Sequence, residues 1–204
     1  MKNNMSGFNF WMVKKISKGL FIMLVAGLCL TVSSCDPAKK YAVEIEKIDS
    51  CLTVIDHYDS LHHTIQFDSL QWMVSHVLEN EDAIKQYGAS DTVPQLLGSW
   101  MNNCKGVRKS LKDIGGNKMK FNDEIFFMRR QFTNLKTDII NGVYNKDEIE
   151  KYLKIETDGL TNFGVMFGDF YAMQKSQSAI FYSAAPHVDA YVSLIKSEHG
   201  DSLP

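Results

Sequence analysis

Proline and cysteine are both scarce in this sequence, with four residues of each among 204. Runs that alternate apolar with polar residues and are rich in β-branched side chains are also lacking, which argues against a sheet protein. Two of the cysteines lie in, or just after, an N-terminal apolar run, so only Cys51 and Cys104 remain, too few for a disulfide scaffold. These absences favour a helical protein with one hydrophobic core.

A membrane-spanning stretch is absent as well. The apolar run 20–32 holds about a dozen residues, whereas a spanning helix needs roughly 20. Lys14, Lys15 and Lys18 precede the run and two serines follow it. A positively charged start, a short apolar core and small residues at the end are typical of a secretory signal.

The end of this run, Val32-Ser33-Ser34-Cys35, resembles the lipobox of bacterial lipoproteins. The resemblance implies that residues 1–34 are a signal peptide and that Cys35 carries acyl chains such as palmitate. Residues 35–204 would then form a domain that is lipid-anchored to a bacterial membrane and faces the periplasm or the cell surface. Several acyl chains give durable anchoring. The alternative is an ordinary signal peptide, and the choice of inner or outer membrane stays open.

Acidic residues outnumber basic ones in the segment after the signal. Four of the 22 Lys and Arg residues precede Cys35, but none of the 24 Asp and Glu residues do, so the segment carries a net charge of −6. Because phosphate binding needs a basic face, nucleic acid is not expected as a partner.

The first expected helix starts at Asp36, a good N-cap, with Pro37 in the first turn, and ends at Gly88. Its apolar residues recur three and four apart, but the pattern slips over 56–64. A four-residue insertion in a heptad pattern explains the slip without a break, so we expect one continuous helix; a break there is the alternative.

Two shorter helices should follow. Thr92 and Gln95 predict a capping box for the second helix, and the glycines of "IGGNK" predict its end. Asn122 is the expected cap of the third helix, and Asn141-Gly142 the expected end.

The fourth helix should begin at Asn145, with Glu148 three residues later. Its apolar spacing continues past Pro186, which predicts a kinked but continuous helix. The fold class is therefore all-α: an elongated, antiparallel, coiled-coil-like bundle of two long and two short helices. We expect the short helices to pack against the distal half of a two-helix stalk, with both chain ends near the membrane. In the alternative, helices two and three run on in one direction and form a long three-helix bundle. In the favoured arrangement Cys51 and Cys104 are too far apart for a disulfide and should be free thiols.

Asp59, His62 and His63 are weak candidates for a metal site, because a helix places residues three and four apart on one face. Helical di-iron bundles need a second Glu-x-x-His motif, which the sequence lacks. A solvated polar patch is the simpler interpretation, and no metal or other cofactor is predicted.

A run of aromatic residues is the other candidate site. Its spacing favours packed core over a pocket for an apolar ligand. Gly164 and Gly168, which lie between the rings, favour close packing of a neighbouring helix. The residues concerned are Phe163, Phe167, Phe170, Tyr171, Phe126, Phe127 and Phe132.

No sequence motif of an enzyme is present: there is no G-x-S-x-G, Walker or G-x-G-x-x-G sequence. The expected function is that of a membrane-anchored envelope lipoprotein, not an enzyme, which acts as a scaffold or interaction module with an envelope protein as partner. The alternative is a helical bundle that binds a small apolar ligand or a metal ion.

Overall fold

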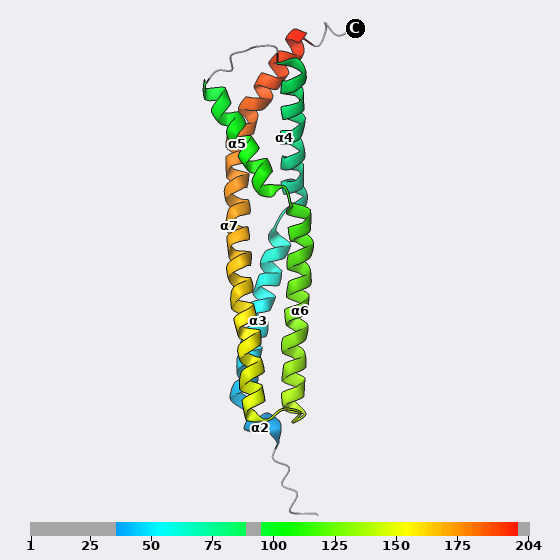
Figure 1. The fold of residues 1–204 in the computed structure, drawn as a ribbon, viewed down its shortest axis with the longest axis vertical. Coiled ribbons are helices and arrows are strands. Elements are labelled where there is room, and N and C mark those ends of the chain that lie inside the picture. Colours follow the sequence, from blue (N-terminus) through cyan, green and yellow to red (C-terminus); the bar gives the residue numbers. More distant parts are fainter. Residues whose placement is uncertain (1–35, 89–94, 200–204) are drawn as a thin grey trace, which may run out of the picture.

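The computed structural model describes residues 36–88 and 95–199, and every regular element in them is an α-helix (Figure 1). The all-α prediction is confirmed. None of the described helices is both long enough and apolar enough to cross a membrane. The helices are α2 (Pro37–Lys40), α3 (Ala42–Thr64), α4 (Phe67–Tyr87), α5 (Gln95–Leu111), α6 (Ile114–Ile140) and α7 (Lys146–His199).

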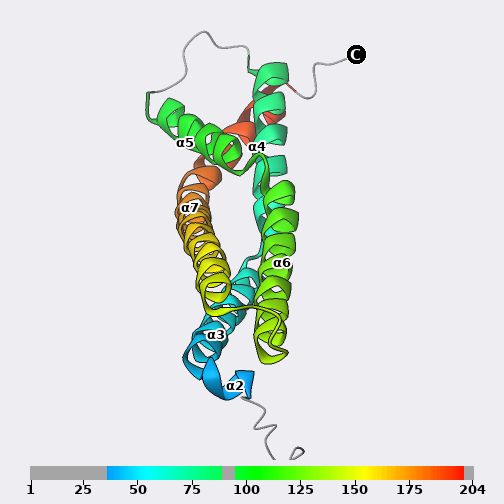
Figure 2. The same ribbon diagram turned by 60° about the horizontal axis from the view of Figure 1, so that its bottom comes forward.

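The chain passes along the long axis of the molecule three times. α3 and α4 ascend one after the other, α5 and α6 descend, and α7 returns over the whole length (Figures 1 and 2). Two three-helix bundles are therefore stacked end to end. The lower bundle consists of α3, α6 and residues 146–170 of α7, and the upper bundle consists of α4, α5 and residues 171–199 of α7. The pairs α5–α7, α4–α7 and α3–α6 make the most extensive contacts.

The descending helices α5 and α6 are not antiparallel to each other, as the favoured arrangement from the sequence would require. α6 begins at Ile114, so Gly115 and Gly116 lie in its first turn and only two residues separate it from α5. Each helical glycine costs about 1 kcal/mol relative to alanine, but Ile114 and Phe121 are both 2 % exposed, and burying such side chains returns roughly 1.5–3 kcal/mol each.

α6 therefore continues in the direction of α5, as in the three-helix alternative. Asn122 lies inside α6 and does not cap it. The three passes also place the end of α7 at the upper tip, opposite α2 (Figure 1). The expectation that both chain ends lie together was wrong for the described residues.

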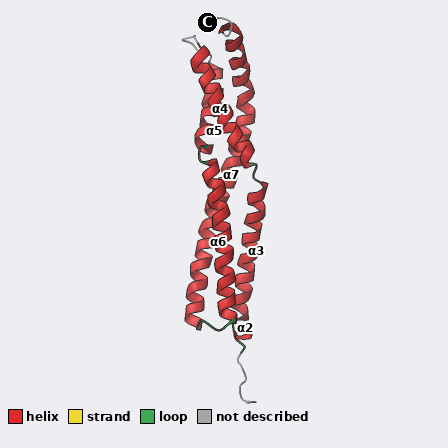
Figure 3. Ribbon diagram, turned by 90° about the vertical axis from the view of Figure 1, so that its right-hand side faces the viewer, coloured by secondary structure: helices red, strands yellow, loops and turns green. Residues whose placement is uncertain are grey.

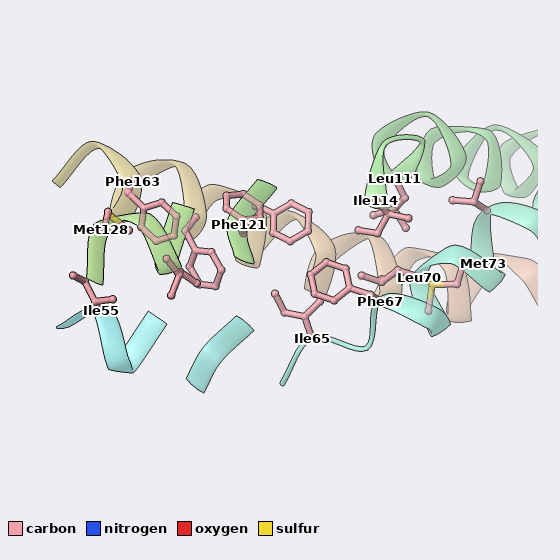
Figure 4. Packing of buried hydrophobic residues seen from close by; sticks show 14 of the residues in the cluster. Ile55, Ile65, Phe67, Leu70, Met73, Leu111, Ile114, Phe121, Met128 and Phe163 are labelled. Carbon is pink, nitrogen blue, oxygen red and sulfur yellow. The ribbon is translucent and has the colours of Figure 1, made fainter. Parts of the chain in front are cut away.

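The expected continuous first helix is interrupted. Residues 56–64 are helical, but Ile65 is extended (φ −74°, ψ 122°) and α4 starts at Phe67. Both side chains are nearly buried, so the break turns the apolar faces of α3 and α4 onto the same core. This break and the one between α5 and α6 lie at the same level (Figure 3), and their buried residues, Ile65, Phe67, Leu70, Leu111, Ile114 and Phe121, form the middle of the core (Figure 4).

Most predicted helix ends are confirmed. The Asp36 carboxylate accepts a hydrogen bond from the amide of Ala38 at 3.1 Å, and Gly88 caps the end of α4. Gly142 ends α6 with a φ of 68°, a value that glycine adopts without strain. The expected cap at Thr92 lies outside the described residues.

α7 forms as predicted. Its capping box is reciprocal, because the amide of Asn145 donates to Glu148 Oε2 at 2.9 Å and the amide of Glu148 donates to Asn145 Oδ1 at 3.1 Å. The helix continues through Pro186, and its last turns tilt away from the axis of the rest (Figure 1). One unbroken helix thus joins the two bundles.

Candidate functional site

The predicted lipidation site lies beside the described residues. Cys35 and the signal segment 1–34 are outside them. Asp36 begins the described chain, and α2 packs against α3 and α6 at the lower tip. An anchor on Cys35 would therefore attach at the lower tip.

The three candidate metal ligands do not converge. The His62 ring is nearly buried, and its Nε2 atom donates to the carbonyl oxygen of Lys118 at 3.3 Å. Burial is the main cause that lowers the pKa of His62. His63 is exposed and donates through Nδ1 to the carbonyl oxygen of Asp59 at 2.8 Å.

The Asp59 carboxylate serves an ion pair instead. Arg129 on α6 donates from Nη2 to both Asp59 Oδ2 and Asp56 Oδ1 at 2.8 Å. These two hydrogen bonds are the leading causes that raise the pKa of Arg129. Among residues 36–88 and 95–198, no three His, Cys, Asp or Glu side chains are grouped as metal ligands. Arg129 and the two aspartates thus join α3 to α6 as a structural ion pair.

Most of the candidate aromatic residues are packed against one another near the middle of the molecule. The Tyr58 ring lies 5.4 Å from Phe163 and 5.5 Å from Phe167, centroid to centroid, and Phe121 lies 5.3 Å from Phe167. Phe132 and Phe170 are also buried, Tyr171 is half-buried, and Phe126 and Phe127 are exposed on α6. The buried rings thus form core, the interpretation that the sequence favoured, but that interpretation was wrong for Phe126 and Phe127.

The two glycines between these rings have different surroundings. A Cβ atom on Gly164 would collide with the Tyr58 hydroxyl, whereas one on Gly168 would meet nothing within 4 Å. Gly164 therefore permits the close packing of α3 on α7 that was predicted, and Gly168 has no such role.

A group of polar side chains that the sequence did not reveal lies in the upper bundle. The His76 ring on α4 donates from Nε2 to Asp189 Oδ1 on α7 at 2.8 Å, and Asn80 Nδ2 donates to the same oxygen at 2.6 Å. We call His76, Asn80 and Asp189 the α4–α7 polar cluster. Because the two donors occupy one carboxylate oxygen, the cluster fixes α4 against α7.

Exposed aromatic rings border this cluster. Trp72 is 51 % exposed and stacks on His76, with centroids 5.1 Å apart. Trp72 also lies 5.5 Å from Phe181, which in turn lies 5.5 Å from Tyr182, a residue that is 59 % exposed. Trp72 and Tyr182 thus flank one buried ring on the α4–α7 face, with most of their own surface in solvent.

A groove opens on another side of the upper bundle, between α4 and α5. It has a volume of about 270 Å³ and reaches down to α7 at Val188. Its apolar lining consists of Val77, Ile84, Met101, Cys104 and Val188. We call it the α4–α5 groove. Asn80 belongs to both the groove and the polar cluster, so the two features adjoin.

Cys104 is buried beside this groove. Burial is the largest cause that raises the pKa of its thiol to about 11, and the negative charges of Asp189 and Glu81 add to the effect. Cys104 is therefore a neutral thiol at physiological pH and a poor nucleophile. Cys104 and Cys51 are both free, as predicted.

The upper site was missed because its parts are distant in sequence. Trp72, His76 and Asn80 follow one another at intervals of four, a spacing that places them on one helix face. This spacing was sufficient to predict from the sequence that the three α4 residues share a face. The partner, Asp189, is 113 residues from His76 and lies beyond Pro186, and nothing local marks it.

No family model, curated protein or solved structure matches the chain. Function must therefore be argued from the geometry of the described residues.

Proposed function

We propose that the protein is a non-enzymatic lipoprotein of the bacterial cell envelope, a scaffold that holds an interaction surface away from the membrane. The observation that supports the proposal most is the separation of two features. Asp36, next to the lipobox cysteine, lies at the lower tip, whereas Trp72 and Tyr182 lie in the upper bundle. α7 has 54 residues, which at 1.5 Å per residue corresponds to about 80 Å.

The α4–α7 face of the upper bundle has the character of a protein contact surface. Trp and Tyr are the residues most enriched among those that dominate binding energy at interfaces. Trp72 is held in one orientation by its contacts with His76 and Phe181. A partner would therefore lose little free energy in ordering it.

The anchor is tested by metabolic labelling with a palmitate analogue. Cys35→Ala should abolish incorporation, whereas Cys51→Ala should leave it unchanged. Incorporation into the Cys35→Ala protein would contradict the lipid anchor.

The interaction surface is tested by a photo-crosslinking amino acid at position 72 or 182 in intact cells. Phe126, which is 63 % exposed in the lower bundle, gives the matched control position. We expect one envelope protein to be cross-linked from positions 72 and 182 but not from 126, and Trp72→Ala to abolish its co-purification. Equal cross-linking from all three positions would refute a specific surface on the upper bundle.

A further inference from the structure

The rim of the α4–α5 groove carries positive charge. Lys85 from α4 and Lys105 from α5 both line it. α5 contributes three basic residues in all and contains no Asp or Glu between Gln95 and Leu111. This concentration contrasts with the net negative charge of the segment after Cys35.

The acidic residues near the rim are already paired. Arg108 Nε donates to Glu81 Oε1 at 3.2 Å across the two helices, and Lys85 pairs with Asp82 at 2.9 Å. Lys105 forms no ion pair with any described residue. Its ammonium group is therefore available to an anion at the mouth of the groove.

Below the rim, the lining of the groove is mostly apolar. Its volume of about 270 Å³ lies just under the usual range for small-molecule sites, about 300–1,000 Å³. The floor offers methyl groups and the neutral Cys104 thiol, and Met101 is a flexible side chain that adapts to irregular ligands. This small volume and apolar lining suit a single hydrocarbon chain better than a peptide helix.

We propose that the α4–α5 groove binds a medium-chain fatty acid, with the hydrocarbon chain on the Val77, Met101, Cys104 and Val188 floor and the carboxylate at Lys105. Charge complementarity at the rim selects an anion over a neutral or cationic amphiphile. This inference does not rest on the proposed scaffold function, because the groove opens between α4 and α5 whereas Trp72 and Tyr182 lie on the α4–α7 face.

The test uses the full chain in phospholipid nanodiscs and a ten-carbon fatty acid with a photoactivatable diazirine near its methyl end. Mass spectrometry of the peptides maps where the probe inserts. We expect insertion in the peptides that contain Val77, Met101 and Cys104, competed away by unlabelled decanoate. Labelling spread over exposed apolar residues such as Phe126 and Val165 would overturn the proposal.

Charge recognition is tested with a matched pair of variants on α5. Lys105→Glu should reduce labelling of the groove by up to about fivefold, the upper end for an exposed ion pair. Lys109→Glu makes the same charge change at an exposed position that does not line the groove, and it should alter labelling less than twofold.

A neutral alcohol with the same diazirine chain separates charge recognition from damage to the fold. Lys105→Glu should leave labelling by this alcohol unchanged, and the alcohol should label the wild-type groove more weakly than the acid does. If Lys105→Glu lowers labelling by both probes equally, Lys105 does not recognise the carboxylate and the proposal is wrong.

Discussion

The two stacked bundles are built from the same chain and share α7, yet their interiors differ. The lower bundle is filled by large side chains, among them the rings of Phe132, Phe163 and Phe167 at 0–2 % exposure. The upper bundle also buries the Phe181 ring, but it contains more small buried side chains. These small side chains include Val77, Ala83, Val107, Ala184, Ala185, Val188 and Val192.

The polar residues of the two bundles differ more clearly than their grooves do. A groove of about 480 Å³ opens between α3 and α7 in the lower bundle, and the α4–α5 groove opens in the upper one. The lower bundle joins α3 to α6 by ion pairs. The upper bundle joins α4 to α7 by the α4–α7 polar cluster, in which two donors meet one carboxylate oxygen. Under the proposed function, the lower bundle gives support and the upper bundle carries the interaction surface.

The largest expected effect comes from removing a buried aromatic ring from the lower bundle. Phe167→Ala should destabilise the protein by about 3–5 kcal/mol, because it removes a ring that is 1 % exposed and leaves a cavity. Val188→Ala in the upper bundle should cost only about 1.5 kcal/mol, the value of two methyl groups, because it widens an existing groove. Denaturant unfolding followed by circular dichroism measures both. Equal losses would contradict the contrast between the two interiors.

The pH dependence of stability should report on the buried thiol of the upper bundle. The pKa of Cys104 is about 11 when folded and 9 for the unperturbed group, so between these values the folded state holds a proton that the unfolded state releases. Stability should therefore fall as pH rises from 9 to 11, by roughly 2–3 kcal/mol. Unfolding curves at a series of pH values measure the slope.

Cys104→Ala is the control for this slope. The variant should be less stable than the wild-type protein at pH 8. Its stability should not show the fall above pH 9 that the Cys104 thiol causes in the wild-type protein. An unchanged slope would mean that Cys104 ionises as freely in the folded chain as in the unfolded one, and the upper interior would then be as wet as its surface.

Sequence reasoning succeeded where a local pattern determines the outcome. The Asn145–Glu148 capping box and the passage of α7 through Pro186 depend on residues that are close along the chain, and both are confirmed. Pro186 is exposed, so the carbonyl group that it leaves unpaired can be hydrated.

The arrangement of α5 and α6 could not be predicted in the same way. The propensity of Gly115 and Gly116 favours a loop, but burial of Ile114 and Phe121 against other helices outweighs it. That burial depends on contacts with α4 and α7, which no local pattern reveals. The His76–Asp189 contact was hidden for the same reason.

Alanine substitutions at the two glycines of α7 in the lower bundle test close packing, because they should change stability by smaller amounts and in opposite directions. Gly164→Ala should cost about 1 kcal/mol, because the clash with the Tyr58 hydroxyl (about 1–3 kcal/mol for overpacking) exceeds the gain in helix propensity of about 1 kcal/mol. Gly168→Ala meets no atom and should stabilise the protein by up to about 1 kcal/mol. Combining Gly164→Ala with Tyr58→Phe should recover the loss in a double-mutant cycle; no recovery would place the clash elsewhere.

The smallest expected effect concerns the ion pairs that join α3 to α6. Arg129 is partly exposed and contacts Asp56 and Asp59, and pairs of this kind contribute up to about 1 kcal/mol. Arg129→Met should cost that much at low salt and less in 1 M NaCl, where the screening length falls to about 3 Å. Arg130→Met is the control, because Arg130 is exposed and forms no ion pair with a described residue. If the two variants are equally stable at low salt, the rigidity of the lower bundle comes from its interlocked rings alone, and the ion pairs serve only to fix which face of α3 meets α6.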